Sequence, residues 1–409
     1  MSTGDAGTKL VKLTEIQGRG RALVASQSLT AGQVLLRDSP LLLYSALPLL
    51  HHHSHHYCSN CFRTLSSSSS SIVSCSSCSS HALFCNPSCL SLSLSSSHSS
   101  WVCQSLSRLR NPPFLTRLEN RHELQIQAQF LISAYNLAVI NPSNFQILLS
   151  LQGQPTDLGS DSDSLSLLHS LIESLSPPQS NFGVSLQLTA ALLAKDKINA
   201  FGLMEPLNSK AERSVRAYGI YPMASFFNHD CLPNACRFDY VDALDRDYPG
   251  NVEIIVRVLH DVEQGREICL SYFPVNLKYS ERQKRLLDDY GFVCACDRCK
   301  VESNWSDEED EVMDEDDGGD SLDDDYDDDL MVGSGNENEN DNGVEGDFPH
   351  AYFFLKFMCQ RENCWGTLAP LPPSEGVTST IMECNVCGNL KKGDEIDGDA
   401  VAGSFGMDN

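Results

Sequence analysis

Short apolar runs bounded by glycine turns occupy the first part of the chain. Ala22–Ala25 follows the turn Gly18–Gly20, and Gln33–Leu36 follows the turn Ala31-Gly32. Runs of this length between turn residues are typical of β-strands. We therefore predict short strands over residues 10–45.

The period of the apolar positions becomes helical after residue 104. The clearest case is one set that recurs every three or four residues: Phe130, Leu131, Ala134, Leu137 and Ala138. Ser164–Leu175, which follows a polar loop, and Leu188–Ile198 show the same period less cleanly. Together these segments predict a helical insert over residues 104–215.

Strand-like runs return between residues 216 and 273. Ala235–Tyr240, Val252–Val258 and Glu267–Tyr272 are short and rich in β-branched or aromatic residues. A short helix should follow, because Ser280 and Gln283 have the spacing of a capping box. The pattern predicts an α+β fold that is mainly β with a helical insert.

The cysteines of the chain point to metal rather than to disulfides. The chain has 409 residues and 17 Cys, an odd number. It has neither a secretory signal nor a run of eighteen apolar residues, so we expect a protein that is neither secreted nor embedded in a membrane. In a reducing compartment, clustered Cys are more often metal ligands than disulfides.

Fifteen of these Cys, with one His, fall into groups of four or eight. The first group is Cys58, Cys61, Cys75, Cys78, Cys85, Cys89, His98 and Cys103, the second is Cys231, Cys294, Cys296 and Cys299, and the third is Cys359, Cys364, Cys384 and Cys387. Sets of four suit tetrahedral zinc. Buried, unligated thiols are the alternative, but these Cys stand among Ser, Asn and Asp. Cys236 and Cys269 remain, in apolar segments where Cys acts as a small hydrophobe.

The acidity of the chain is local. Residues 302–347 contain 22 Asp or Glu and neither Lys nor Arg, and removing them from the net charge of −26 leaves −4. Such a block repels itself and cannot bury a core, so we predict a disordered linker over 301–349. Two roles stay open for it: a solvating linker, or a phosphate mimic that binds basic proteins.

Several motifs together resemble one protein family. Asn228-His229-Asp230-Cys231-Leu232-Pro233-Asn234 is similar to the Asn-His-Ser-Cys-x-Pro-Asn motif of SET-domain lysine methyltransferases. Gly18-Arg19-Gly20 resembles the cofactor loop of that family, Gly265-Arg266-Glu267-Ile268 resembles the segment before its catalytic tyrosine, and Cys294-x-Cys296-x2-Cys299 resembles its post-SET zinc motif. A Cys-rich finger inserted after the first strands resembles the SET-and-MYND subgroup. The acidic linker and a terminal ribbon resemble some plant SET proteins.

The resemblance implies a SET fold of small sheets with a pseudoknot, and a division of the chain. The SET domain would comprise residues 10–50 and 216–273, interrupted by a MYND-like finger over 58–103 and the helical insert. A post-SET segment over 274–300 and a zinc-ribbon-like module over 350–390 would complete the chain.

The implied activity is methyl transfer from S-adenosylmethionine to a protein lysine. Tyr272 would be the catalytic residue. The cofactor would be held by Arg19, Gly20, Asn199, Ser225, Asn228, His229, Tyr272 and Phe292. Phe201 and Tyr290 would line the lysine channel. Cys231 would tie the post-SET cysteines to this site, which would bring Tyr290 and Phe292 to the cofactor.

The finger of this subgroup binds two zinc ions with alternating ligands. One ion is expected on Cys58, Cys61, Cys85 and Cys89, and the other on Cys75, Cys78, His98 and Cys103. His81 is an alternative ligand, because four residues rather than three separate His98 from Cys103. Asp230 also departs from the family Ser, and Arg266 from its Glu.

The expected substrate is a protein lysine, on histones or other proteins, in the nucleus or the cytoplasm. MYND-like fingers imply a proline-containing peptide as a further partner. A non-catalytic zinc-rich adaptor is the alternative function. Direct nucleic-acid binding is not expected, since Arg63, Arg108 and Arg110 are too few to neutralise several phosphates.

Overall fold

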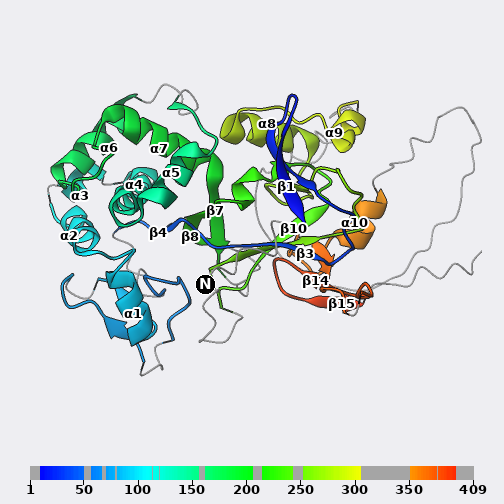
Figure 1. The fold of residues 1–409 in the computed structure, drawn as a ribbon, viewed down its shortest axis with the longest axis horizontal. Coiled ribbons are helices and arrows are strands. Elements are labelled where there is room, and N and C mark those ends of the chain that lie inside the picture. The colour runs from blue at the N-terminus through cyan, green and yellow to red at the C-terminus, as the bar shows by residue number, and fades with distance from the viewer. Residues whose placement is uncertain are drawn as a thin grey trace, which may run out of the picture.

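The computed structural model describes residues 10–49, 57–66, 71–78, 81–112, 114–118, 120–155, 162–205, 214–242, 252–304, 351–374 and 376–392. These residues form a mixed α+β fold of small sheets with a helical insert, which confirms the predicted class (Figure 1). Most of the predicted acidic linker, and residues 67–70 within the finger, lie outside the described residues. In the part of the chain that is described, no helix is both long and apolar enough to cross a membrane.

The two ends of the SET segment in sequence are interleaved in space. The strands β1 (Val11–Ile16) and β2 (Gly20–Ala25) pair as an antiparallel hairpin. The central strand β11 (Ile254–Val258) pairs with β10 (Ala235–Asp239) on one side and with β3 (Val34–Asp38) on the other. The two halves of the chain therefore share one sheet.

Two very short strands carry the motif residues. The strand β9 (Asn228–His229) pairs in parallel with β12 (Cys269–Leu270), which is shorter than the predicted Glu267–Tyr272. The 3₁₀ turn η4 (Ala224–Phe226) precedes β9, and the Asp38 carboxylate accepts hydrogen bonds from Met223 N and Ala224 N, both at 2.8 Å. Asp38 thus fixes the entry to the motif.

A three-stranded sheet connects the SET strands to the insert. Its order is β4 (Leu42–Ser45), β8 (Val215–Ile220) and β7 (Ala200–Met204). The last helix of the predicted insert therefore ends at Asn199, and strand β7 follows it directly. The helical period of the preceding segment runs directly into β7 without a glycine or proline to mark the change.

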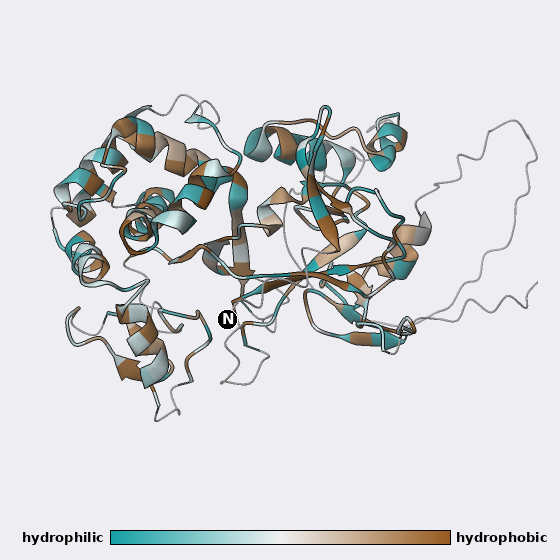
Figure 2. Cartoon of the chain, viewed as in Figure 1, coloured by the Kyte–Doolittle hydropathy of each residue, from teal (hydrophilic) through white to brown (hydrophobic). Residues whose placement is uncertain are grey.

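The helical insert packs around its longest helix. Its helices are α2 (Ser100–Leu109), α3 (Phe114–Leu118), α4 (His122–Ile140), α5 (Pro142–Ser150), α6 (Ser162–Ser174) and α7 (Leu186–Asn199). All five residues of the predicted α4 face are buried. Each of these helices carries both hydrophobic and hydrophilic residues (Figure 2). The predicted helix over Ser164–Leu175 is confirmed as α6.

The finger and the post-SET segment lie at different ends of the molecule (Figure 1). The finger contains β5 (Val73–Ser74), β6 (Leu83–Phe84) and α1 (Pro87–Leu94). The post-SET segment contains α8 (Tyr279–Tyr290) and α9 (Asp297–Glu302). The predicted cap at Ser280 is wrong, because the capping residue of α8 is Lys278, two residues before Ser280. The Lys278 N–H donates to the Glu281 carboxylate at 3.3 Å.

The C-terminal residues form a small sheet beside β10 and β11. The helix α10 (Ala351–Phe357) precedes the antiparallel strands β13 (Leu368–Pro370), β14 (Ile381–Cys384) and β15 (Leu390–Lys392). These elements make up the segment that the sequence predicts to be a zinc-ribbon-like module.

Candidate active site and metal clusters

Asn234, the second asparagine of the motif, connects the loop after β9 to the β12 segment by two hydrogen bonds. Asn234 donates through Nδ2 to Glu267 O at 2.8 Å and accepts through Oδ1 from Cys269 N at 2.9 Å. The Asp230 carboxylate accepts from Leu232 N at 2.9 Å. Asp230 therefore closes the turn as a serine hydroxyl would, so the departure from the family motif keeps the loop geometry.

The β1–β2 turn crosses the same loop. Arg19 donates to His229 O at 3.0 Å and forms an ion pair of 2.8 Å with Glu267. The Asn228 amide donates to the same carboxylate at 2.9 Å and to Arg19 O at 3.3 Å. Gly20 has φ of +72° and open space where a side chain would begin, so a ligand can approach this backbone closely.

Tyr272 lies directly against His229. The Tyr272 N–H donates to His229 Nδ1 at 3.1 Å, and the two ring centroids are 5.2 Å apart. Burial lowers the pKa of His229 to about 3, so the imidazole is neutral. Because Nδ1 accepts, the proton is on Nε2, which faces the Cys231 sulfur at 3.3 Å. His229 thus links the tyrosine to the post-SET cysteines.

The Tyr272 hydroxyl stays protonated. Burial raises the pKa of this phenol well above its ordinary value, and the hydroxyl donates to Phe227 O at 2.9 Å. On its other side, the Tyr272 ring is 4.8 Å from the Tyr290 ring, centroid to centroid. Tyr272 therefore stands between the Arg19–Asn228–His229 group and Tyr290.

A cleft of about 600 Å³ opens on the Tyr290 side. Four of the predicted site residues line it: Phe201, Ser225, Tyr272 and Tyr290. The Ser225 hydroxyl donates to Tyr221 O at 2.7 Å, so it is turned toward the backbone of its own turn. The cleft wall at Phe201 is supported by Arg237, whose guanidinium carbon is 5.5 Å from the ring centroid.

The two remaining predicted cofactor residues, Asn199 and Phe292, do not line the cleft. Asn199 is buried at the end of α7, where its amide donates to Gln152 O and Lys195 O, both at 2.8 Å, and it lines none of the described cavities. The structure does not bring it to the motif loop. Phe292 is 37% exposed, with its ring 6.5 Å from that of His229.

The thiols of Cys231, Cys294, Cys296 and Cys299 converge beside His229, with all ligand atoms within 4.8 Å of one another. Cys231 Sγ is 4.0 Å from Cys294 Sγ and 3.5 Å from Cys299 Sγ. A disulfide would need about 2.0 Å. Zinc–sulfur bonds of about 2.3 Å in a tetrahedron place the sulfurs about 3.8 Å apart. The four thiols therefore fit zinc.

Comparison with known proteins agrees with this geometry. A family model described as the SET domain matches residues 20–273. The chain is 54% identical over 407 residues to "Histone-lysine N-methyltransferase ASHR2" of Arabidopsis thaliana, covering 96% of this chain and 98% of that protein.

The chain belongs to the SET-domain family.

Other similarities are narrower. The chain is 31% identical over 97 residues to "Histone-lysine N-methyltransferase SMYD3" of Homo sapiens, covering 24% of this chain and 20% of that protein. A solved structure, "Crystal structure of the SET domain of LSMT bound to Lysine and AdoHcy", covers 71% of this chain and 54% of that one, at 15% identity and a TM-score of 0.31.

The post-SET cluster of this SET-domain protein rests on a buried arginine that sequence reasoning did not identify. Arg282 is fully buried and donates through Nε to Cys231 Sγ at 3.3 Å. A second nitrogen approaches Cys299 Sγ at 3.7 Å and also pairs with Glu302. Hydrogen bonds of this kind neutralise part of the thiolate charge and orient the ligands.

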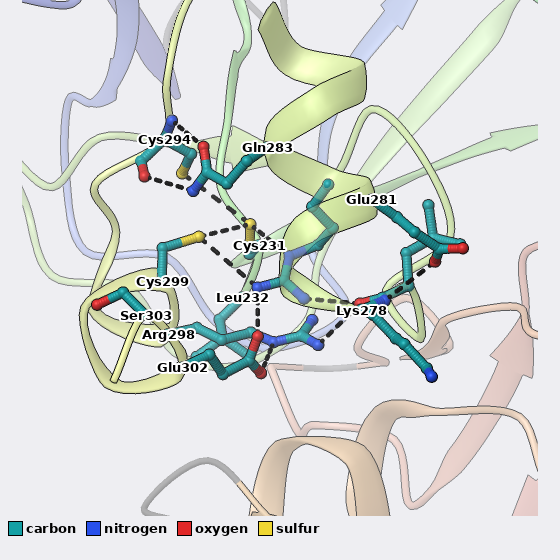
Figure 3. A network of polar contacts seen from close by, with 12 residues as sticks. Cys231, Leu232, Lys278, Glu281, Gln283, Cys294, Arg298, Cys299, Glu302 and Ser303 are labelled. Atoms are coloured by element: carbon teal, nitrogen blue, oxygen red, sulfur yellow. Dashed lines mark hydrogen bonds and ion pairs between the residues drawn. The ribbon is translucent and has the colours of Figure 1, made fainter. Parts of the chain in front are cut away.

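Glu302 is shared between two arginines. Arg298 Nε contacts its other carboxylate oxygen at 2.6 Å, and both Arg298 and Glu302 are buried (Figure 3). The Gln283 side chain on α8 adds two bonds to the Cys294 backbone, at 2.8 and 3.0 Å. The only sequence signal for this network is the four-residue spacing of Arg298 and Glu302 beside a cysteine motif.

The finger of the SET-domain protein gathers its ligands in the alternating order expected. One cluster is Cys58, Cys61, Cys85 and Cys89, and the other is Cys75, Cys78, His98 and Cys103. Separations of 3.9 Å for Cys61–Cys85 and 3.8 Å for Cys75–Cys103 fit zinc by the same argument. His98 Nε2 is 3.7 Å from Cys78 Sγ, so His98 rather than the exposed His81 completes the second cluster.

The C-terminal module holds a fourth cluster, Cys359, Cys364, Cys384 and Cys387. Cys359 and Cys387 are 3.8 Å apart, and Cys364 and Cys384 are 3.5 Å apart. The two Cys expected as hydrophobes, Cys236 and Cys269, are buried outside all four clusters.

Proposed function

We propose that this SET-domain protein is a histone-lysine N-methyltransferase that uses S-adenosylmethionine. The observation that carries the proposal is the position of Tyr272 between two different sites. One is the polar group around Arg19, Asn228 and His229, and the other is the partly apolar cleft. The near full-length similarity to the Arabidopsis enzyme supports the same activity.

The polar side fits the cofactor. Gly20 and the neighbouring Gly18, both with positive φ, leave open space beside the loop, and Asn228, His229 and Arg19 supply polar atoms around it. Phe292, more than a third exposed near His229, offers a flat apolar face for a purine. When bound, S-adenosylmethionine supplies an electrophilic methyl group on sulfur.

The cleft side prepares the lysine. Methyl transfer requires a neutral amine, whereas the ordinary lysine pKa is about 10.4. Phe201, Phe227 and Tyr290 line the approach with apolar surface, which disfavours the ammonium form and lowers that pKa. The Tyr272 hydroxyl donates to Phe227 O, so its oxygen lone pairs are left to orient the amine. Positioning of this kind lowers barriers by roughly 7–11 kcal/mol in favourable systems.

The post-SET cluster has a mechanical part in this proposal. The helix α8 ends at Tyr290 because Gly291 adopts φ of +76° and Phe292 N donates to Leu286 O at 3.2 Å. Cys294 follows two residues later and joins Cys231 beside His229. Zinc on this cluster therefore fixes Tyr290 and Phe292 on the two sides of the site.

We further propose two kinds of partner and a nuclear location. The two-cluster finger has the ligand order of a MYND domain, and we assign it a proline-containing peptide. The acidic residues 305–350 lie outside the described structure, and their charge suits a basic protein partner. A histone substrate places the enzyme in the nucleus as a chromatin regulator.

The test is methyl transfer to recombinant core histones from a cofactor labelled in its methyl group, with the modified lysine located by mass spectrometry. Transfer by the wild type supports the enzyme. A protein that binds the cofactor but labels neither histones nor proteins of a cell lysate would instead be the adaptor.

A further inference from the structure

The C-terminal ribbon, defined as residues 351–392, shares a hydrophobic core with the SET sheet. Phe238 of β10 and Ile255 of β11 pack in one cluster with Phe357, Leu368 and Met382 of the ribbon. The ribbon therefore buries its apolar face against the catalytic domain.

A buried ion pair fixes the same interface. Glu383 of β14 accepts from Arg257 of β11 at 2.6 Å, and Tyr240 donates to the same carboxylate at 3.0 and 3.1 Å. Gly32 approaches the ribbon so closely that a Cβ would lie 2.3 Å from Leu371 O. The ribbon is a fixed part of the molecule and not a separate module on a tether.

This fixed ribbon forms one wall of the cleft that Tyr272 lines. Its lining residues are Asn363, Cys364, Trp365, Thr367, Asn385 and Val386. The Asn385 amide also donates to Arg237 O at 3.1 Å, and Arg237 supports Phe201 across the cleft. The ribbon thus lines the cleft and also contacts β10, the strand that carries Arg237.

Trp365 is the largest ribbon side chain on this wall, and it is 47% exposed. It has φ of +52°, and Asn363 two residues earlier has φ of +54°. Phe62 has φ of +53° directly after Cys61 in the finger, so the left-handed backbone belongs to the cysteine turn. The turn leaves Phe62 buried but holds Trp365 half in solvent at the cleft.

We propose that the ribbon is a substrate-recognition surface and that Trp365 contacts the residues flanking the target lysine. This rests on the proposed methyltransferase function. The occupant is an extended polypeptide, because the cleft shares Ala200, Tyr218 and Tyr290 with a second cavity of about 1030 Å³. Their combined volume far exceeds that of one lysine side chain.

The side chain that packs on Trp365 is uncharged. None of the ribbon residues that line the cleft carries a carboxylate to pair a cation, and Arg237 and Arg285 in the same lining would repel one. Asp239 is already placed against Arg237 at 3.8 Å. A large apolar side chain next to the lysine can pack on the Trp365 indole, and it has no hydrogen bonds to water to lose when it does so.

The experiment is steady-state kinetics on recombinant core histones with wild type, Trp365→Ala, Trp365→His and Leu390→Ala. Leu390 is the matched control, since it is exposed on β15 of the same ribbon and does not line the cleft. We expect Trp365→Ala to raise KM roughly tenfold, as for a central aromatic contact, with kcat and cofactor affinity unchanged. Trp365→His should be intermediate and Leu390→Ala unchanged.

A peptide series around the mapped lysine sharpens the test. Replacing the large apolar flanking residue by Ala should raise KM for the wild type but not for Trp365→Ala. Zinc content reports on folding; if Trp365→Ala loses zinc, Trp365→His decides, because His tolerates positive φ. An unchanged KM in a zinc-loaded variant overturns the inference alone. A wild type that labels no histone overturns the histone proposal instead.

Discussion

Replacing Arg282 by Met should loosen the post-SET zinc cluster selectively. The side chain is fully buried, donates to the sulfurs of Cys231 and Cys299 and pairs with Glu302. Breaking a buried ion pair from one side costs about 3–5 kcal/mol. Because Arg298 still pairs with Glu302 at 2.6 Å, we expect a cost at the lower end of this range, so that this segment loses about 3 kcal/mol of stability.

The loss should also appear in metal affinity. Removing a hydrogen-bonding partner of a metal ligand typically weakens binding by about 10–100-fold. The assay is competition with a colorimetric chelator. One zinc equivalent, that of the Cys231 cluster, should be lost to the chelator more readily than in the wild type. The zinc affinity of the other three clusters should be unchanged. Cofactor affinity should fall with it, because Tyr290 and Phe292 lose their anchor.

Arg285→Met on the same helix is the matched control. Arg285 is half exposed and pairs only loosely with Asp289, at 3.8 Å, so its loss should change stability by less than about 0.5 kcal/mol. If Arg282→Met holds all of its zinc as tightly as the wild type does, the role assigned to this network is refuted.

Two further predictions concern other supports of the site. Cys296→Ser should lose one zinc equivalent and methyl transfer while the SET strands stay folded by circular dichroism; normal turnover without that zinc would contradict the anchor. Burial raises the pKa of Asp38 from 3.8 to about 6, so the folded state keeps a proton that the unfolded chain releases. Wild-type stability relative to Asp38→Asn should therefore fall by about 2 kcal/mol as pH rises from 4 to 7. Urea unfolding at both pH values measures this, and a constant difference would show that Asp38 titrates normally.

The local ligand motifs were predictable because most of the ligands of each metal cluster lie only a few residues apart in the sequence. Cys294, Cys296 and Cys299 lie within six residues, and the structure gathers them with Cys231 as the motif resemblance implied. The five-residue face of α4 was equally visible, because its buried positions follow the helical period over several turns.

The supports of the site were not predictable, because they depend on contacts between distant residues. Arg282 reaches Cys231 across 51 positions, and the ribbon is held by Arg257 and Glu383, which are 126 positions apart. Nothing in the local pattern marks either pair. Asn199 was expected at the cofactor from its place before Phe201, and the local pattern does not show that its amide donates to Gln152 O and Lys195 O at the end of α7.

We propose that the Tyr272 hydroxyl aligns the lysine amine without holding the cofactor. The most direct test is Tyr272→Phe, with single-turnover methyl transfer to histones measured beside calorimetric binding of the cofactor product, S-adenosylhomocysteine. We predict that transfer falls by about 100-fold or more, as for a misplaced reacting group, while product affinity stays within about twofold. Full-rate transfer by Tyr272→Phe, or a loss of transfer explained by lost binding, would contradict the account.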